Sequence, residues 1–220
     1  MDLFPLWNSL RIALYSSVVV FFAGIFAAYY ISRFPKGLKG AIDVILTLPM
    51  VLPPTVCGYM LLLIFGNRRP LGIFLAQFDI KFVMTWYGGV LAASVVAFPL
   101  MYRTARGAFE GFDETLSYCG QTLGLSNTYI FWRIRIPTCH QGIIAGAVLA
   151  FARALGEYGA TSMLIGYTPG RTATISTTVY QLWRTNKSEE AFMWVLVNLL
   201  ISAAVLMTVN LLEQKKVVGK

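Results

Sequence analysis

The stretch Tyr118-Cys-Gly-Gln-Thr-Leu-Gly124, followed ten residues after Gly124 by Ile134-Arg-Ile-Pro137, lies between two long apolar stretches of the chain. It is polar, and it is preceded by a segment without proline, so a helix is compatible with it. A short polar helix between two membrane spans has to leave the lipid. The spacing therefore predicts an extramembrane helix, which either docks on a partner or lies on the lipid surface without one.

The local pattern supports this helix. Leu116, Cys119 and Leu123 recur near helical spacing, with polar residues between them, so the helix is amphipathic. We expect Asp113 to cap its N-terminus and Gly124 to allow a close-packed turn. We expect Pro137 to end it.

Composition indicates a membrane protein. Of the 220 residues, 57% are hydrophobic and 13% are charged, and the mean hydropathy is +0.65. The net charge of +8 does not indicate nucleic-acid binding, because the Lys and Arg residues are scattered at the ends of apolar segments and form no face. The three cysteines show no metal-ligand spacing, and His140 beside Cys139 is a poor case for zinc or catalysis.

Five apolar stretches are long enough to cross a bilayer, which needs about 20 residues per helix. The first stretch has no basic start and no small-x-small cleavage site, so we expect it to remain as a span and not to act as a signal peptide. Prolines should kink or unwind the second span (Pro49, Pro53 and Pro54) and the third (Pro99). The predicted spans are Trp7–Ile31, Ala41–Phe65, Thr85–Met101, Gln141–Ile165 and Ala191–Leu212.

The positive charges predict the orientation. With the N-terminus outside, the cytoplasmic segments hold ten cationic residues and the outer segments hold seven, so the positive-inside rule favours an outer N-terminus and a cytoplasmic C-terminus. The cytoplasmic set is Arg33, Lys36, Lys39, Arg103, Arg106, Arg133, Arg135, Lys215, Lys216 and Lys220. The outer set is Arg11, Arg68, Arg69, Lys81, Arg171, Arg184 and Lys187.

Two sets of motifs resemble known families. The spacing Gly-x9-Ile-x-hydrophobic-Pro, from Gly124 to Pro137, resembles the loop signature of the membrane subunits of bacterial ABC importers. The run Phe151-Ala-Arg-Ala-Leu-Gly-Glu-Tyr-Gly-Ala-Thr161, with Pro169-Gly-Arg-Thr172, Thr178-Val-Tyr180 and the segment Asp43 to Thr55, resembles the permeases of molybdate importers. Sulfate and tungstate permeases carry less closely matching versions. The resemblance extends from about Trp7 to Leu212.

This resemblance implies an all-α integral membrane protein, the transmembrane domain of a type I ABC importer, with about five spans and a cytoplasmic coupling helix. It implies one permease domain over residues 1–220, with a core at about 7–212 and a coupling loop at about 110–137, in a bacterial cytoplasmic membrane. The implied ATPase-coupling residues are Leu116, Tyr118, Gly120, Leu123, Gly124, Ile134 and Pro137. The family loop usually begins with Glu-Ala-Ala, whereas this chain has Tyr118-Cys119-Gly120, so the role of that acidic residue does not carry over.

The implied partners are two copies of a cytoplasmic ABC ATPase, a second permease copy forming a homodimer, an extracytoplasmic molybdate-binding protein and membrane lipid. The chain has no Gly-x4-Gly-Lys-Ser/Thr motif, so we expect ATP to be hydrolysed by the separate subunit and expect no catalytic residue, cofactor or metal here. The alternatives are a permease for tungstate or for sulfate and thiosulfate, and a channel or scaffold with no ATPase partner.

Charges inside the fourth predicted span point to a second site. Arg153 and Glu157 lie four residues apart, so they can form an ion pair on one helix face. The pair either fixes helix packing or takes part in the path of the anion. The candidates for the translocation path or gate are Arg153, Glu157, Thr161 and Ser162.

Two further patterns remained open. Small residues at Gly142, Gly146, Ala150 and Ala154 form a stripe that allows close helix contact, within one copy or between two copies. The segment Thr172 to Asn186 is too polar for a span, and it is expected to form a short re-entrant or surface helix. With the loop Asn67 to Lys81, it is the expected outer surface for a binding protein.

Overall fold

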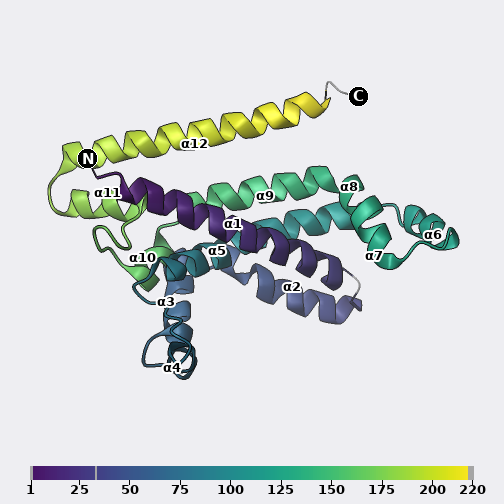
Figure 1. Cartoon of the computed structure of the whole chain (residues 1–220), viewed down its shortest axis with the longest axis horizontal. Helices are drawn as coiled ribbons and strands as arrows, with labels where there is room; N and C mark the ends of the chain where they lie inside the picture. The colour runs from purple at the N-terminus through teal and green to yellow at the C-terminus, as the bar shows by residue number, and fades with distance from the viewer. Residues whose placement is uncertain (1, 33, 218–220) are drawn as a thin grey trace.

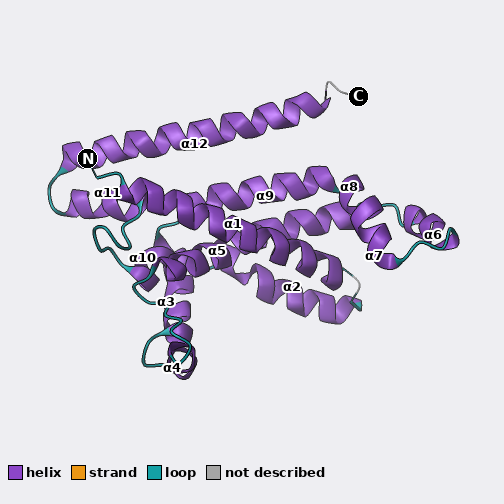
Figure 2. Ribbon diagram, in the orientation of Figure 1, coloured by secondary structure: helices purple, strands orange, loops and turns teal. Residues whose placement is uncertain are grey.

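A computed structural model describes residues 2–32 and 34–217, with residue 36 and residues 208–217 described by their backbone alone. Every regular element in these residues is helical (Figure 2). The longer helices are α1 (Phe4–Ile31), α2 (Lys36–Val51), α3 (Pro54–Phe65), α5 (Trp86–Glu110), α9 (His140–Leu155) and α12 (Ser188–Val217). The shorter ones are α4 (Pro70–Ala76), α6 (Thr115–Thr122), α7 (Asn127–Ile130), α8 (Ile136–Thr138), α10 (Gly159–Ile165) and α11 (Ile175–Arg184), with a π-helical turn η1 (Phe131–Arg135).

The core is made by α1, α5 and α9, which run side by side in Figure 1. Small residues bring these helices close. A Cβ atom at Gly24 of α1 would lie 2.6 Å from Met101 Cγ of α5, and one at Gly142 of α9 would lie 2.6 Å from Ala108 Cβ. Such contacts supply the dispersion energy that replaces the hydrophobic effect between helices in lipid.

The small-residue stripe of α9 is therefore a contact within one copy of the chain. Gly146 faces Met101 and Thr104 of α5, and Ala150 and Ala154 are buried. This settles the alternative that the sequence left open, because α5 already occupies the glycine half of the stripe.

Up to five membrane crossings can be counted in the described residues, which equals the number of predicted spans if each of two bent helix pairs is one crossing. Three single helices are long and apolar enough to cross a membrane: Phe4–Ile31, Trp86–Glu110 and Ser188–Met207. Two bent helix pairs also pass the test of length and apolarity, Gly37–Val51 with Pro54–Phe65 at 114° and Asn127–Thr138 with His140–Leu155 at 74°. Of the second pair, only His140–Leu155 overlaps the predicted fourth span. The fourth predicted span, Gln141 to Ile165, is interrupted after Leu155, since α9 and α10 are separate helices.

Prolines explain the break in the second span. Pro53 and Pro54 donate no backbone N–H, and Leu52, which precedes Pro53, adopts the extended conformation that a following proline favours (ψ 143°). By contrast, Pro49 lies inside α2 and Pro99 inside α5 without ending either helix. Beyond the break α3 packs against α10, where Gly58 meets Ala160.

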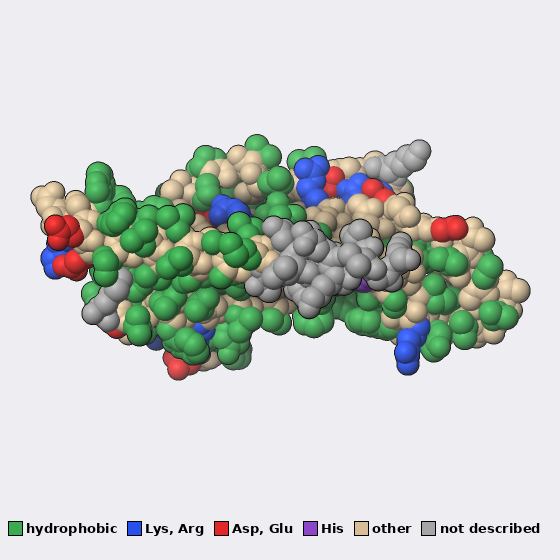
Figure 3. All heavy atoms as spheres, turned by 90° about the horizontal axis from the view of Figure 1, so that it is seen from above, with side chains coloured by type: hydrophobic (Ala, Val, Ile, Leu, Met, Phe, Trp, Pro, Cys, Tyr) green, Lys and Arg blue, Asp and Glu red, His purple; other side chains and the backbone are tan. Residues whose placement is uncertain are grey.

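Helix α12 lies apart from the core in Figure 1 and packs mainly on α11. Only 11% of the residues in its most apolar stretch are buried, and large side chains such as Phe192, Leu199 and Leu200 are exposed. Hydrophobic side chains also dominate the face seen in Figure 3. A helix that is apolar all round and exposed in the isolated chain is suited to lipid or to a neighbouring membrane protein.

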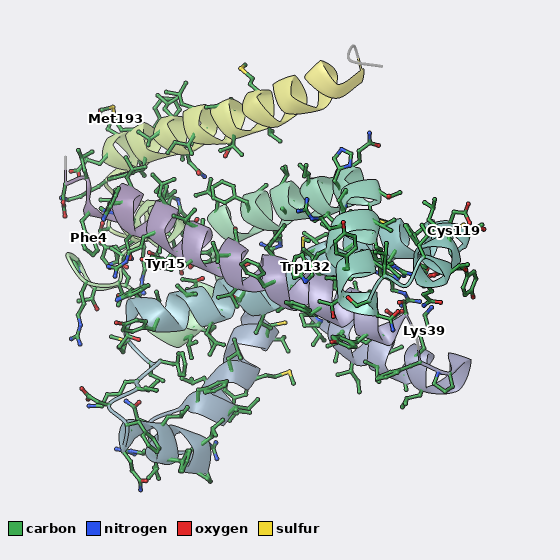
Figure 4. All side chains as sticks on the ribbon, turned by 45° about the vertical axis from the view of Figure 1, so that its right-hand side comes forward. Phe4, Tyr15, Lys39, Cys119, Trp132 and Met193 are labelled. Carbon is green, nitrogen blue, oxygen red and sulfur yellow. The ribbon has the colours of Figure 1, made fainter. Side chains whose placement is uncertain are left out.

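The connections separate into two ends. The α1–α2 turn, α6 and the end of α12 lie at one end in Figure 1, and the start of α1, α11 and the start of α12 lie at the other. Figure 4 shows Lys39 and Cys119 at the first end and Phe4 and Met193 at the second. This alternation is the one predicted from the spans. Of the cations used to predict orientation, Arg33 and Lys220 lie outside the described residues, as do the side chains of Lys36, Lys215 and Lys216.

An ion network at the first end joins α2 to α5. Glu110 Oε1 accepts hydrogen bonds from Lys39 Nζ at 2.7 Å and from Arg106 Nε at 2.8 Å, and Arg106 also pairs with Asp43. Because the two helices share these charges, the α2 half of the broken span is fixed to the core, while its α3 half packs on α10.

We predict that Gly58→Ala destabilises the fold by about 1–3 kcal/mol, the usual cost of overpacking. Its Cβ would lie 2.7 Å from the Cα of Ala160, and backbone atoms cannot rotate away. The measurement is thermal unfolding of the purified chain in detergent. The matched control is Gly40→Ala, whose Cβ meets nothing within 4 Å in α2 and should stabilise slightly. Equal midpoints for the two variants would contradict the close α3–α10 contact.

Candidate coupling element and intramembrane charge pair

Helix α6 begins one residue later than the predicted cap at Asp113 implies. Its N-cap residue is Glu114, and the neighbouring Asp113 accepts a hydrogen bond from the Thr115 amide at 2.9 Å. Hydrogen bonds from Thr115 to the carboxylate hold the pKa of Asp113 below its usual value. The expectation that Asp113 is the N-cap residue is therefore wrong by one position: Asp113 precedes the cap, and Glu114 at the cap makes no side-chain capping hydrogen bond.

The single helix expected across this loop is divided at Gly124. Gly124 has φ +77°, a conformation that other residues rarely adopt, and a Cβ there would meet nothing within 4 Å. The Leu125 amide donates to the Gly120 carbonyl at 3.0 Å, which closes the end of α6. Ser126 then caps α7 by accepting from the Tyr129 amide at 3.2 Å. Gly124 is therefore required by its backbone angle and not by close packing.

The expectation that Pro137 ends the helix is wrong. Residues from Asn127 to Thr138 continue through α7, η1 and α8, with Pro137 at the second position of α8. The wider π-helical turn before it accommodates the missing N–H and the proline ring. The chain bends only after Thr138, at Cys139, where α9 leaves at 74°.

The inner face of α6 packs on the following helical run. A Cβ at Gly120 would lie 3.0 Å from Ile130 Cγ1 and 3.4 Å from Ile134 Cδ1, so only a small residue fits there. The side chains of Gln121 and Asn127 join the same two elements through a 3.1 Å hydrogen bond. The structure thus brings together Gly120 and Ile134, two of the predicted coupling residues.

Three apolar side chains of this element are exposed, two in α6 and one directly after its last residue. Leu116, Tyr118 and Leu123 are 42%, 65% and 78% exposed. We call these three residues the docking face. With Gly120 packed inward, these exposed apolar side chains lie at the end of the molecule that also carries Lys39.

One residue of this element was missed as a candidate. Arg135 is 5% exposed, and its Nη2 atom donates to both carboxylate oxygens of Glu114 at 2.6 Å and to Ser117 Oγ at 3.2 Å. Its guanidinium lies 4.5 Å from the ring centre of Phe112 and 5.5 Å from that of Tyr29. From the sequence, Arg135 counted only as a cytoplasmic cation, because its partner lies 21 residues away and no helical spacing links them.

The predicted ion pair between Arg153 and Glu157 is present, but the backbone between the two residues is not one continuous helix. Arg153 Nη1 lies 2.7 Å from Glu157 Oε2, but α9 ends at Leu155, so the two residues do not share one helix. The other carboxylate oxygen, Oε1, accepts from the Ala160 amide at 2.8 Å and so satisfies the first turn of α10. Glu157 holds the break between two helices and neutralises Arg153.

The remaining path candidates lie within α10. Thr161 is 2% exposed, and the Ser162 hydroxyl donates to the Gly159 carbonyl at 3.0 Å. The side chain of Glu157 is 1% exposed, whereas that of Arg153 is 32% exposed. Of the four candidates, Arg153 therefore offers the charged surface, and the others support the packing around it.

No group of three His, Cys, Asp or Glu side chains that could hold a metal ion occurs within residues 2–32 and 34–217. His140 is exposed, and its Nδ1 lies 2.6 Å from the Pro137 carbonyl oxygen. This contact occupies one ring nitrogen at the bend before α9.

We predict that Arg153→Met destabilises the chain by about 3 kcal/mol, because it leaves the buried carboxylate of Glu157 without its cation. The double variant Arg153→Met, Glu157→Gln should recover most of this loss, since the glutamine still accepts from the Ala160 amide and carries no charge. Thermal unfolding in detergent measures both. Additive losses in the double variant would contradict the ion pair.

Known proteins resemble the chain in sequence. A molybdenum transport system permease protein of Escherichia coli K12, named ModB, is 43% identical over 190 residues, which cover 84% of this chain and 83% of that protein. A putative molybdenum transport system permease protein of Bacillus subtilis, YvgM, is 35% identical over 96% of this chain and 92% of its own length. A sulfate transport system permease protein of Synechocystis, CysW, is 29% identical over 87% of this chain and 70% of its own length.

Solved structures share the fold. A bacterial ABC transporter that imports the acidic polysaccharide alginate matches 97% of this chain and 79% of its own, with a TM-score of 0.78 and 17% identity. The methionine ABC transporter MetNI matches 94% of this chain and 93% of its own, with a TM-score of 0.69 and 13% identity. At these identities the likeness concerns the fold alone, which is that of a type I ABC importer transmembrane domain.

Residues 21–216 match the family described as "Binding-protein-dependent transport system inner membrane component". That match covers nearly the whole chain and includes α6, the Arg153–Glu157 pair and most of the candidate crossings. The chain therefore belongs to the family of binding-protein-dependent inner-membrane transport components, and it is an ABC importer permease, a transport subunit and not an enzyme.

Proposed function

We propose that this permease carries molybdate across the cytoplasmic membrane as a pair of identical copies, with tungstate or sulfate as the alternative cargo. The observation that supports molybdate is the 43% identity with a molybdenum permease over 84% of the chain, compared with 29% for a sulfate permease. Both comparisons extend over most of the fold, so the difference does not come from one motif.

The energy comes from ATP bound by a separate subunit. We propose that each of two cytoplasmic ATPases receives the docking face of one permease copy. An apolar helix face of this kind fits a groove on a partner, as in helix-in-groove recognition. Closure of the ATPases on ATP would move the two α6 helices together and switch the translocation path between outward and inward access.

The charge pair suits a passing anion. Arg153 offers a cation that is one-third exposed, and Glu157 cancels much of its field. A dianion would be attracted without being held tightly, which a path requires because an ion has to leave as readily as it enters. High affinity would reside on the extracytoplasmic binding protein that delivers the molybdate.

That binding protein would dock at the end opposite α6, which we propose faces outward together with the N-terminus. Helices α4 and α11 lie in the two loops expected to receive it, and α11 is held to α1 by hydrogen bonds from Asn8 Nδ2 to the Ala173 carbonyl and from the Ile175 amide to Ser9 Oγ. The docking surface is thus fixed to a helix that spans the membrane. Its cations are Arg68, Arg69, Arg171 and Arg184.

The test of docking is co-purification of the ATPase with Leu123→Asp. Leu123 is 78% exposed, so the change should leave the fold intact and place an unpaired charge in an apolar contact. We expect the amount of co-purified ATPase to fall at least about tenfold, the effect of about 1.4 kcal/mol. The matched control is Leu38→Asp, an exposed leucine of α2, which should retain the ATPase.

Retention of the ATPase by Leu123→Asp would contradict docking through α6. Cargo is tested separately, by ATP-dependent uptake of labelled molybdate and sulfate into vesicles that contain the wild-type importer and its binding protein. Uptake of sulfate without molybdate would leave the machine unchanged and reassign its cargo. Absence of any ATPase in wild-type preparations would favour a channel or scaffold.

Orientation is tested with a native thiol. Of the three cysteines, Cys119 on α6 is exposed, and Cys57 and Cys139 are buried. We expect a membrane-impermeant maleimide to label inverted membrane vesicles and to leave intact spheroplasts unlabelled, with Cys119→Ser as the control that abolishes labelling. Labelling of intact spheroplasts would place α6 outside and exclude a cytoplasmic ATPase as its partner.

A further inference from the structure

Arg135 joins four separate parts of the chain at the end that carries α6. It belongs to the π-helical turn η1, and it contacts Tyr29 of α1, Phe112 after α5, and Glu114 and Ser117 at the start of α6. Its Nη2 atom donates to a carboxylate and a hydroxyl, and its guanidinium lies near two aromatic rings. Arg135 therefore links the start of α6 to aromatic side chains of α1 and of the segment after α5.

The hydrogen bonds from Arg135 to Glu114 are strong, and they act at the start of α6. Both N–H···O distances are 2.6 Å, and the arginine side chain is 7% exposed whereas that of Glu114 is 51% exposed. Charge-assisted hydrogen bonds of this length are about twice as strong as neutral ones. Because Glu114 is the residue before the first turn of α6, the bond fixes the start of the helix that carries the docking face.

The aromatic side of Arg135 leads into the membrane. The Tyr29 ring lies 4.4 Å from that of Phe131 in η1 and 6.0 Å from that of Phe109 in α5. Tyr29 itself is 8% exposed and sits near the inner end of α1, which crosses the membrane as one unbroken helix. A displacement of α6 that carries Arg135 with it would therefore act on α1, α5 and η1 together.

We propose that Arg135 is the positioning residue through which α6 moves the membrane helices: with Glu114 it makes α6, η1 and the inner end of α1 one rigid unit. This inference rests on the proposed docking of an ATPase on α6 and deepens it. Docking supplies the force at the exposed face of α6, and the Arg135–Glu114 bond transmits that force to the core. Without the bond, α6 would still hold the ATPase through the docking face but would turn on its own loops.

The experiment compares Arg135→Gln with Arg133→Gln in the assembled importer with its ATPase and binding protein. Arg133 lies in the same turn, is exposed and carries the same charge, so it is a matched control. We expect Arg135→Gln to co-purify with the ATPase and to import about tenfold less molybdate per ATP hydrolysed, within the range for residues that link two coupled sites. The control should keep the wild-type ratio.

Two further measurements separate transmission from general damage. Glu114→Gln removes the carboxylate from a half-exposed position, and the double variant with Arg135→Gln should lower the import ratio no further than Arg135→Gln alone. A spin label on the exposed Cys119 should become more mobile in Arg135→Gln than in the wild type, and Arg135→Lys should lie between them.

Loss of the ATPase together with import in Arg135→Gln would overturn the inference and make Arg135 a support of the docking face. An unchanged ratio of molybdate to ATP would overturn it as well, and so would an unchanged label mobility. If the wild-type permease itself failed to retain the ATPase, the proposed docking would be wrong, and that result is distinct from all three.

Discussion

The structure depends on how closely α5 approaches α1 and α9. Hydrocarbon offers no hydrophobic effect between helices, so contacts between small residues have to supply the attraction. Gly24 and the stripe from Gly142 to Ala154 allow this approach, and Met101 fills the space between them with an exposed fraction of 0%. The coupling element and the charge pair are both carried by helices of this group or by their direct extensions.

The interruptions of the helices are where polar chemistry enters. Backbone groups in lipid need internal partners, so a break is tolerated where a side chain can satisfy it. Glu157 does this between α9 and α10 by accepting from the Ala160 amide, and Ser126 and the Gly124 turn do it between α6 and α7. The same groups fix the helix ends next to Arg153 and next to the docking face.

Those features of the fold that depend on residues close together in the sequence could be predicted from it. Span number, the α6 helix and the glycine turn follow from composition, spacing and backbone rules that act over a few residues. The continuation of the helical run past Pro137 did not follow from the sequence. It depends on the π-helical turn η1, which packs against α6. Nor did the partner of Arg135, since Glu114 lies 21 residues away and meets it only after the chain folds back. Glu157 was paired correctly with Arg153, but the end of α9 between them was not foreseen.

The low burial of α12 affects how the chain enters the membrane. Its most apolar stretch carries few charges, and only 11% of the residues in that stretch are buried in the protein. Its insertion into lipid is therefore favourable before any other helix is present. Helix α9 differs, because Arg153 needs Glu157 and the glycine half of its stripe needs α5. Helix α12 is therefore stable in lipid on its own, whereas the helix with the charged residue gains a stable position only when its neighbours are already in the bilayer.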